Sequence, residues 1–556
     1  MKKWLSLLFI VFLAIALVAC STGGSDEEGQ TDTEDETEDN GEEENNQDES
    51  SGDKKILYMN NGIEPTSFDP PVGFDAASYN ALNNLMEGLT RLDENHQPQP
   101  AMAERWDISD DGTEYTFYLR EDANWSNGDP VTADDFVHAW TRLLDPNAEP
   151  PSGAAFLGYF IAGAEEFNNG EGSAEDVMIE AVEEKVFKVT LNAPTGFFLD
   201  LVSNPAFFPV NHTVAQADPT WHTEADTFVS NGPFMLTEWN HEQNFVFQKN
   251  PEYWDADSVK LDEVHWAMVN DSNTSYQMYQ SGDVDSASIP ADLADELLEG
   301  DDIFYEEQAG AHFYRFNVTE EPFQNVNIRK AFAMAINQEE IAEYIVKNMQ
   351  RPAYGFVSYG FLDANGNDFR ETNGDLISYD PDQAVELLQK GMEEEGYDEL
   401  PPVTLSYNTS DQNKDIAEYM QQQYIDVLGI EVTLENTEWG VFLQDQQNLQ
   451  HQLSRSSFLA DYGDPVNFLE SFITDSSMNR TGWSNERYDE LIALSKQEAD
   501  EEQRYEYLYE AEKILFEDMP IFPLHFYNQV MLQNPDVTGI VRHPVGYLEL
   551  KWADKN

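Results

Sequence analysis

The sequence predicts an α/β protein whose body has more than one lobe. The clearest sign is a β-α-β unit: a strand at residues 403–407, a helix from about 414 to 428 and, after Gly429, a second strand at 430–434. Such a unit implies two parallel strands joined by a right-handed helical crossover. The 556 residues, of which 40% are hydrophobic and 12% aromatic, also suffice for a large core or several domains.

Earlier in the chain, a strand and a helix are predicted from local patterns. Residues 113–119 alternate as a half-buried strand does, with Tyr115, Phe117 and Leu119 on one face. The Asn127-Gly128 turn follows. Thr132, with Asp135 three residues later, then predicts the start of a helix.

Two more helix starts are predicted in the second half of the chain. Asn337 and Glu340 form a capping pair ahead of apolar residues at helical spacing. Asp380-Pro381 places a proline in the first turn of another helix. No repeat of roughly 20–50 residues is found, so the chain is neither a solenoid nor a propeller.

The charge of the chain is extreme and argues against several functions. There are 107 acidic and 29 basic residues, a formal net charge of −78, and only 15 of the acids lie in residues 26–53. A field of this sign repels phosphate backbones and anionic membrane surfaces, so nucleic-acid binding is not expected. Because concentrated salt would screen the self-repulsion, we interpret the acidity as a halophilic or alkaliphilic adaptation.

Residues 1–53 predict export and tethering. Lys2 and Lys3 precede an apolar run at 5–19 that is too short to span a bilayer comfortably, and small residues lead to Cys20, the only cysteine. Residues 21–53 are predicted to be a disordered acidic tether. Residues 17–20 resemble the lipobox of bacterial lipoproteins, which implies a signal peptide over 1–20, a lipidated Cys20 and a position on the outer face of the cytoplasmic membrane of a Gram-positive bacterium. The alternative is an ordinary signal peptide with an incidental cysteine.

The sequence lacks the usual signatures of catalysis and of metal binding. His241-Glu242 is not followed by the second histidine of a zinc-protease helix, and no nucleophile elbow, phosphate-binding loop or EF-hand pattern is found. Because Cys20 is the only cysteine, thiol catalysis is excluded. The ten histidines show no i, i+4 pair on an evident helix. We therefore predict no enzyme activity, no cofactor and no metal site.

Several motifs resemble the oligopeptide-binding proteins of ABC importers, and they occur in that family's order. They lie at residues 60–62, 69–70, 103–106, 111–120, 125–136, 279–285, 328–332, 351–355 and 460–462. The resemblance extends from about Lys55 to the C-terminus. It implies a two-lobed Venus flytrap fold of the periplasmic-binding-protein type with an extra third domain.

The resemblance also implies domain boundaries and partners. Residues 54–78, 231–310 and 528–556 would form domain I, 79–230 domain II and 311–527 domain III. An oligopeptide would bind between the lobes, and the closed form would be recognised by ABC permease and ATPase subunits. The protein is expected to be a monomer held at the membrane by its lipid anchor.

Two charged residues of the predicted binding site would contact the two ends of the peptide. Asp461, within Ala460-Asp461-Tyr462, matches the family aspartate that pairs with the peptide α-ammonium. Arg455 matches a family arginine that can meet the carboxylate of short peptides, and the alternative for it is a structural ion pair. Gln446 and Ala333 stand where the enteric pattern has an arginine and a lysine, so recognition of one fixed C-terminus is not implied.

Five further residues complete the predicted site by resemblance. Phe458 and Leu459 would offer pocket surface and main-chain groups, Trp439 would line a side-chain pocket, and Tyr527 lies near another site position. For the aromatic residues the alternative is packing in the core. Glu64 lies on the segment that would run beside the peptide, although its side chain could equally face water.

The predicted function is thus an extracellular peptide receptor of an ABC importer. A peptide-pheromone sensor of the same fold is the alternative, and relatives that carry dipeptides, nickel complexes or sugars leave the ligand open. A secreted hydrolase acting through carboxylates would need an activated nucleophile or a spaced acid and base, which no motif supplies.

Overall fold

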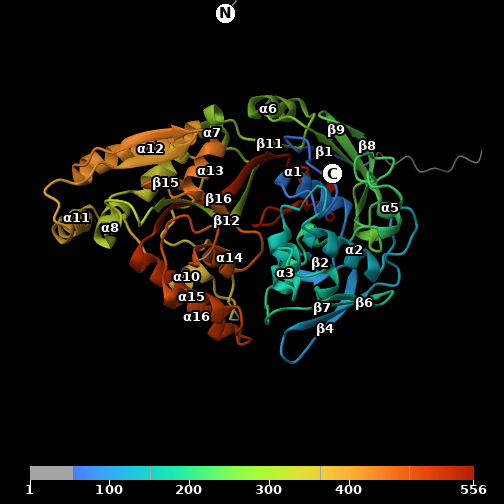
Figure 1. Cartoon of the computed structure of the whole chain (residues 1–556). Coiled ribbons are helices and arrows are strands. Elements are labelled where there is room, and N and C mark those ends of the chain that lie inside the picture. Colours follow the sequence, from blue (N-terminus) through green and yellow to red (C-terminus); the bar gives the residue numbers. More distant parts are fainter. Residues whose placement is uncertain (1–53, 151, 364, 475) are drawn as a thin grey trace, which may run out of the picture. The chain divides into compact units, whose positions relative to one another are not determined.

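Three large β-sheets organise the part of the chain that the computed structural model describes, residues 54–556 without 151, 364 and 475 (Figure 1). The expected signal, tether and Cys20 lie outside these residues. The first sheet has the order β1 (Ile56–Asn60), β10 (Glu263–Ala267), β9 (Asn244–Lys249) and β8 (Phe234–Asn240). The second has the order β4 (Ala103–Ile108), β5 (Glu114–Leu119), β7 (Val186–Thr190) and β6 (Ile179–Glu183).

The third sheet contains the two longest strands of the described chain. Its order is β11 (Ser286–Ser288), β16 (Ile521–Gln533), β12 (Ile303–Phe316), β15 (Leu453–Leu459), β13 (Thr404–Asn408) and β14 (Thr433–Thr437). β12 and β16 run antiparallel side by side, from the pair Ile303 and Leu532 to the pair Arg315 and Ile521 (Figure 1). The predicted boundaries after residues 310 and 527 fall inside these two strands, and the domain division itself stays a prediction.

Short two-stranded ribbons and helices complete the described chain. The ribbons are β2 (Thr90–Leu92) with β3 (Pro98–Pro100), β17 (Val537–Thr538) with β20 (Asp554–Lys555), and β18 (Val541–Arg542) with β19 (Leu548–Glu549). The α-helices are α1 (Ala76–Leu85), α2 (Ala133–Leu144), α3 (Ala164–Asn168), α4 (Phe198–Leu201), α5 (His212–Ala217), α6 (Ser272–Ser281), α7 (Ala294–Leu297), α8 (Val326–Met334), α9 (Gln338–Glu340), α10 (Phe369–Asn373), α11 (Pro381–Glu395), α12 (Asp411–Gln423), α13 (Trp439–Gln447), α14 (Pro465–Leu469), α15 (Glu486–Ser495) and α16 (Glu501–Asp518).

Single turns of tighter or wider helix lie between these elements. The 3-10 turns are η1 (Ala155–Phe160), η2 (Ala174–Asp176), η3 (Pro205–Phe207), η4 (Ala256–Ser258), η5 (Ala291–Leu293) and η8 (Glu470–Phe472), and the π turns are η6 (Ile341–Val346) and η7 (Tyr424–Leu428). Among the described residues, no helix combines the length and the apolar character that a membrane crossing requires.

The predicted β-α-β unit is confirmed, with shifted boundaries. β13 and β14 are parallel neighbours, joined through α12 and η7. The helix begins three residues earlier than predicted, because the Ser410 side chain accepts a hydrogen bond from the Asn413 amide and caps it. The second strand begins only at Thr433, since the chain leaves η7 through Gly429 in a left-handed conformation and Ile430 still bonds back to the Tyr424 carbonyl.

The other local predictions are confirmed except for the helix after Asn337. Tyr115, Phe117 and Leu119 are the buried residues of β5. Thr132 and Asp135 form the capping box of α2, and Asp380 caps α11 ahead of Pro381. The helix capped by Asn337 differs from the prediction in form: one α-turn leads into η6, which leaves Tyr344 exposed.

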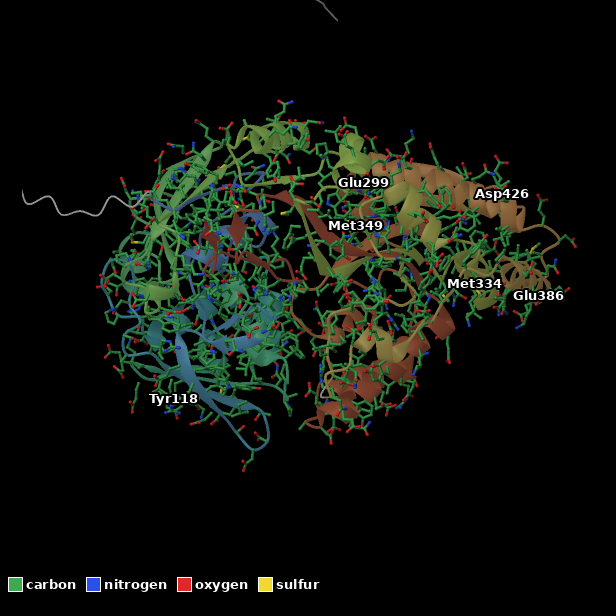
Figure 2. The ribbon with its side chains drawn as sticks, turned by 180° about the vertical axis from the view of Figure 1, so that it is seen from behind. Tyr118, Glu299, Met334, Met349, Glu386 and Asp426 are labelled. Atoms are coloured by element: carbon green, nitrogen blue, oxygen red, sulfur yellow. The ribbon has the colours of Figure 1, made fainter. Side chains whose placement is uncertain are left out.

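Acidic side chains project from the surface of the described chain. Figure 2 shows Glu299 after α7, Glu386 on α11 and Asp426 in η7, all of them exposed. The net charge is therefore largely solvated at the surface rather than gathered in one cluster.

Candidate functional site

Asp461 lies where the chain leaves the third sheet. It follows β15, and its amide donates to the Asn467 side-chain oxygen of α14 at 2.8 Å. Its carbonyl accepts from the Tyr547 hydroxyl at 3.0 Å and from the Asn204 side-chain amide at 3.3 Å. Asn204 in turn donates to the Tyr547 hydroxyl at 2.7 Å. Three segments far apart in the sequence therefore hold the backbone of Asp461 in place.

The side chain of Asp461 has no cationic partner within 4.0 Å among the residues that the structure describes, although the carboxyl group is mostly buried. Burial and the nearby Glu470 raise the pKa of Asp461 to about 6, and a hydrogen bond with Asn467 opposes the shift. Three residues on, Asp464 has a partner: the Arg504 guanidinium lies 2.6 Å from its Oδ1. Asp461 is thus a carboxylate that an external cation would stabilise.

A second acid beside Asp461 was not found from the sequence. The Oδ1 atom of Asp200, at the end of α4, accepts from the Gly463 amide at 2.7 Å, and burial raises the pKa of Asp200 to about 6. The Phe197 ring stacks on Tyr462, with centroids 4.6 Å apart and planes 9° apart. Residues 197–204 therefore pack directly against the turn that carries Asp461. No local motif signals this contact, because the two segments are more than 250 residues apart in the sequence.

Arg455 lies on β15 and faces the same side of the sheet as Tyr527 of β16. One Nη atom lies 3.3 Å from the Tyr527 hydroxyl and the other 3.4 Å from the Asn408 side-chain oxygen. In the described chain, no Asp or Glu oxygen comes within 4.0 Å of this guanidinium, so the structural ion pair that the sequence left open is not formed there. Arg455 is available to an external anion.

Two buried histidines lie on the same sheet, close to the Tyr527 ring. His312 of β12 and His525 of β16 are paired across the sheet, with ring centroids 4.9 Å apart. Burial, aided by Arg455, lowers the pKa of both histidines, to about 3 for His525. Both rings are therefore neutral near pH 7, and Arg455 supplies the positive charge on this part of the sheet.

The apolar residues of the predicted site separate into two groups. The Phe458 ring packs in the core, 4.7 Å from Phe468 and 5.9 Å from Phe356, so only its main-chain groups could face a ligand. Leu459 and Trp439 are 44% and 48% exposed. Trp439 opens α13, and among the described residues its ring stacks on Phe442 of the same helix, which leaves much of its surface free for a ligand.

Glu64 is bound to a neighbouring turn rather than facing water freely. Its carboxylate accepts from His241 Nδ1 at 2.8 Å and from the Glu242 amide at 2.7 Å, in the turn between β8 and β9. None of these bonds involves another residue of the predicted site.

The two positions that depart from the enteric pattern carry no charge. Gln446 is buried and donates to the Ser454 hydroxyl and the Arg455 carbonyl, each at 2.8 Å, so it supports the strand that carries Arg455. Ala333 is buried in α8. Within the described ranges, no group of three or more His, Cys, Asp or Glu side chains is arranged to hold a metal ion.

Comparisons with known proteins point to one family. The family model for bacterial extracellular solute-binding proteins, family 5, matches residues 97–480. The dipeptide-binding protein DppE of Bacillus subtilis is 56% identical over 507 residues, which cover 91% of this chain and 93% of that protein. The structure of Listeria monocytogenes OppA bound to peptide is 32% identical and covers 91% of this chain and 99% of that one, with a TM-score of 0.73.

A further solved structure shows a signalling protein with this architecture. The pheromone receptor PrgZ is 30% identical and covers 90% of this chain and 100% of that one, with a TM-score of 0.75. These matches confirm the predicted two-lobed fold of the periplasmic-binding-protein type. They also confirm a solute-binding protein rather than an enzyme.

Proposed function

The chain belongs to the family 5 extracellular solute-binding proteins of bacteria, and on that premise we propose that it captures oligopeptides outside the cell for an ABC importer. One observation carries the proposal: the mostly buried Asp461 carboxylate has no cationic partner within 4.0 Å in the described chain and is held by three segments. A peptide α-ammonium is the cation that such a carboxylate would fit.

Arg455 would receive the other end of a short peptide. Arg455 and Asp461 are six residues apart, and since β15 ends at Leu459 the two are at most about 20 Å apart along the chain. Because an extended peptide spans roughly 3.3–3.6 Å per residue, a ligand of up to about six residues could place its ammonium at Asp461 and its carboxylate at Arg455. A longer peptide would use Asp461 alone. The exposed Trp439 and Leu459 would contact side chains of the ligand.

The test compares peptides that differ only at the N-terminus. Replacing Asp461 by Asn should weaken an unblocked tripeptide by about 30-fold or more, since truncating one partner of a desolvated charge pair costs about 2 kcal/mol or more. The N-acetylated tripeptide should be affected much less in titration calorimetry. Asp426→Asn, the same chemical change at an exposed site, is the control. Equal losses for both peptides would refute the role of Asp461.

Lobe closure would couple binding to transport. In the proposed division, domains I and II form one lobe and domain III the other, and the long strands β12 and β16 pass between them. A peptide that contacts both lobes shifts the population toward a closed form, which the permease and ATPase partners would recognise. Small-angle scattering should show a smaller radius of gyration with tri-alanine, and an unchanged radius would contradict closure.

The N-terminal segment would tether the receptor to its transporter. A lipidated Cys20 and an acidic linker at 21–53 would keep a monomeric receptor on the outer face of the cytoplasmic membrane, at high effective concentration near the permease. Cys20→Ser should release the protein into the medium. Membrane association that survives this change would refute lipidation.

A peptide-pheromone sensor is the second candidate, favoured by the similarity to the pheromone receptor PrgZ. Native mass spectrometry of the purified protein separates the two functions. A mixture of co-purifying peptides supports an importer receptor, a single defined peptide supports a sensor, and a nickel complex or a sugar would overturn both.

A further inference from the structure

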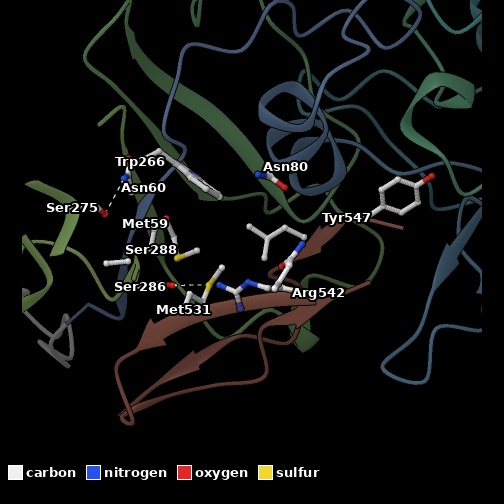
Figure 3. A pocket seen from close by; sticks show the side chains of 14 residues that line it. Met59, Asn60, Asn80, Trp266, Ser275, Ser286, Ser288, Met531, Arg542 and Tyr547 are labelled. Carbon is white, nitrogen blue, oxygen red and sulfur yellow. Dashed lines mark hydrogen bonds between the residues drawn. The ribbon is translucent and has the colours of Figure 1, made fainter. Parts of the chain in front are cut away.

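A cavity of about 180 Å³ lies between the first sheet and the C-terminal segment, beside the predicted ammonium site (Figure 3). Residues from β1, β10, α1, β11, β16 and the β18–β19 ribbon contribute to its walls. None of the fourteen lining residues is Asp or Glu, although about one residue in five of the chain is acidic. The lining of the cavity thus differs in charge from the acidic surface of the protein: it is polar and contains one positively charged and no negatively charged side chain.

The positive charge belongs to Arg542. The side chain is buried, its Nη1 donates to the Gln533 side-chain oxygen at 3.0 Å, and its Cζ lies 4.6 Å from the centroid of the Phe304 ring. Within the described ranges, no carboxylate oxygen lies within 4.0 Å of it, and Glu306 acts on it only from farther away. Burial lowers the pKa of Arg542 to about 10, so the group stays protonated near pH 7. With no carboxylate in contact, this buried charge is compensated only from a distance, and a ligand carboxylate would stabilise it.

A donor in the wall, on Trp266, lacks any acceptor among the described residues. The Trp266 Nε1–H group is buried and has no hydrogen-bond partner in the described chain. The Ser286 hydroxyl donates only to the sulfur of Met531, at 3.1 Å, and a thioether is a weak acceptor. Figure 3 shows the Trp266 ring and the Arg542 side chain on opposite sides of the pocket. Acceptor oxygens placed between them would satisfy both groups.

Tyr547 connects this cavity with the turn that carries Asp461. Its ring is part of the cavity wall, and its hydroxyl, which points away from the pocket in Figure 3, donates to the Asp461 carbonyl at 3.0 Å. One side chain thus separates the space around Arg542 from the proposed position of the peptide α-ammonium. A peptide bound at Asp461 has this cavity as a neighbour.

We propose that the cavity binds a carboxylate, namely an acidic side chain near the N-terminus of the bound peptide, between Arg542 and the Trp266 Nε1–H group. The proposal rests on the peptide-binding function proposed above and specifies its ligand class. Arg542 would make the receptor prefer acidic peptides, which the overall charge of the protein would otherwise repel. A free small carboxylate has the same chemistry and is the other possible source.

The experiment compares matched peptides by titration calorimetry. Tripeptides that carry Glu or Gln at position one or two, with alanine elsewhere, differ by one charge. At the favoured position, Glu should bind about 10- to 100-fold more tightly than Gln, as expected for a buried hydrogen bond to a charged group. Arg542→Gln and Trp266→Phe should each reduce this ratio, Arg542→Gln to about one, whereas Arg542→Lys should keep part of it. Arg105→Gln, at an exposed arginine, is the control for loss of one positive charge.

Tri-alanine separates failure of this inference from failure of the proposed function. If tri-alanine binds but Glu and Gln peptides bind equally, thermal unfolding with glutarate against sodium chloride of equal ionic strength decides. A rise in midpoint that Arg542→Gln abolishes supports a site for a free carboxylate. If no peptide binds, the proposed function fails, and the same glutarate measurement still decides the cavity. Equal binding of Glu and Gln peptides, together with a glutarate effect that all the Arg542 and Trp266 variants keep or that is absent, overturns the proposal.

Discussion

Because Asp461 has no charged partner within 4.0 Å in the described chain, a change that weakens peptide binding is expected to stabilise the empty protein. Asp461→Asn keeps the shape of the side chain and removes its charge. In the empty protein the ionised carboxylate is desolvated and lies near Glu470 without a cation within 4.0 Å in the described chain. Removing the charge therefore removes an unfavourable term from the folded state only.

The magnitude follows from the pKa of Asp461. A rise from 3.8 to about 6 in the folded state corresponds to at most about 3 kcal/mol, and solvent relaxation around a partly exposed carboxyl should reduce this to roughly half. Because the pKa is raised, the folded state binds more protons than the unfolded state between the two values, and wild-type stability falls as the pH rises from 3.8 through 6. The advantage of Asp461→Asn should thus be full above pH 6.5 and vanish near pH 4.

Urea denaturation at several pH values tests this reasoning. The wild type, Asp461→Asn and the exposed control Asp426→Asn would be compared between pH 4 and 8 without ligand. The expected result is a stabilisation of about 1.5 kcal/mol for Asp461→Asn at pH 7 that disappears under acid. A destabilised Asp461→Asn protein, or a difference that does not depend on pH, would show that Asp461 has a counter-charge in the empty protein.

Three other outcomes are expected. Arg504→Leu leaves the buried Asp464 without its partner and should lower the unfolding free energy by about 3–5 kcal/mol, whereas Lys390→Leu, at an exposed i,i+4 pair, should change it little in the same urea measurement. Burial lowers the pKa of His96 and His543, whose Nδ1 atoms are 2.9 Å apart. Because the unfolded state therefore binds more protons, the unfolding free energy should fall as the pH drops below 6.5. His543→Asn should flatten this part of the plot of unfolding free energy against pH. Added sodium chloride should raise the thermal midpoint, and a constant midpoint would contradict the halophilic interpretation.

Local chemistry made many of the helices and strands predictable. The capping box of Thr132 and Asp135 and the Asp380-Pro381 start depend on residues within one turn, and both are found where the sequence placed them. The boundaries around Gly429 were less predictable. There the π turn η7 and its bond from Ile430 back to Tyr424 delay the strand, and no residue pattern marks a π turn.

The candidate site residues came from the resemblance and stay a prediction, and the protonation state of Asp461 could not be predicted from the sequence. Resemblance to a family pointed to Asp461, yet its raised pKa depends on burial by segments far from it in the sequence, 257 residues away for Asn204 and 86 for Tyr547. Asp200 and Arg542 carry no motif at all. Only the folded chain brings Asp200 to the Gly463 amide and Arg542 to a cavity without acids.

The charged side chains of this protein differ in whether a group of opposite charge lies within 4.0 Å of them. Among the described residues, the buried Arg91, Arg370 and Arg504 pair with Glu549, Glu512 and Asp464, whereas the buried Arg315 and Arg329 donate to neutral oxygens. Charged partners within 4.0 Å are likewise missing in the described chain for Arg455, Arg542 and Asp461, and the two arginines contact neutral groups. In the functions proposed above, Asp461 would take the ammonium of the ligand, and Arg455 and Arg542 would each take a carboxylate.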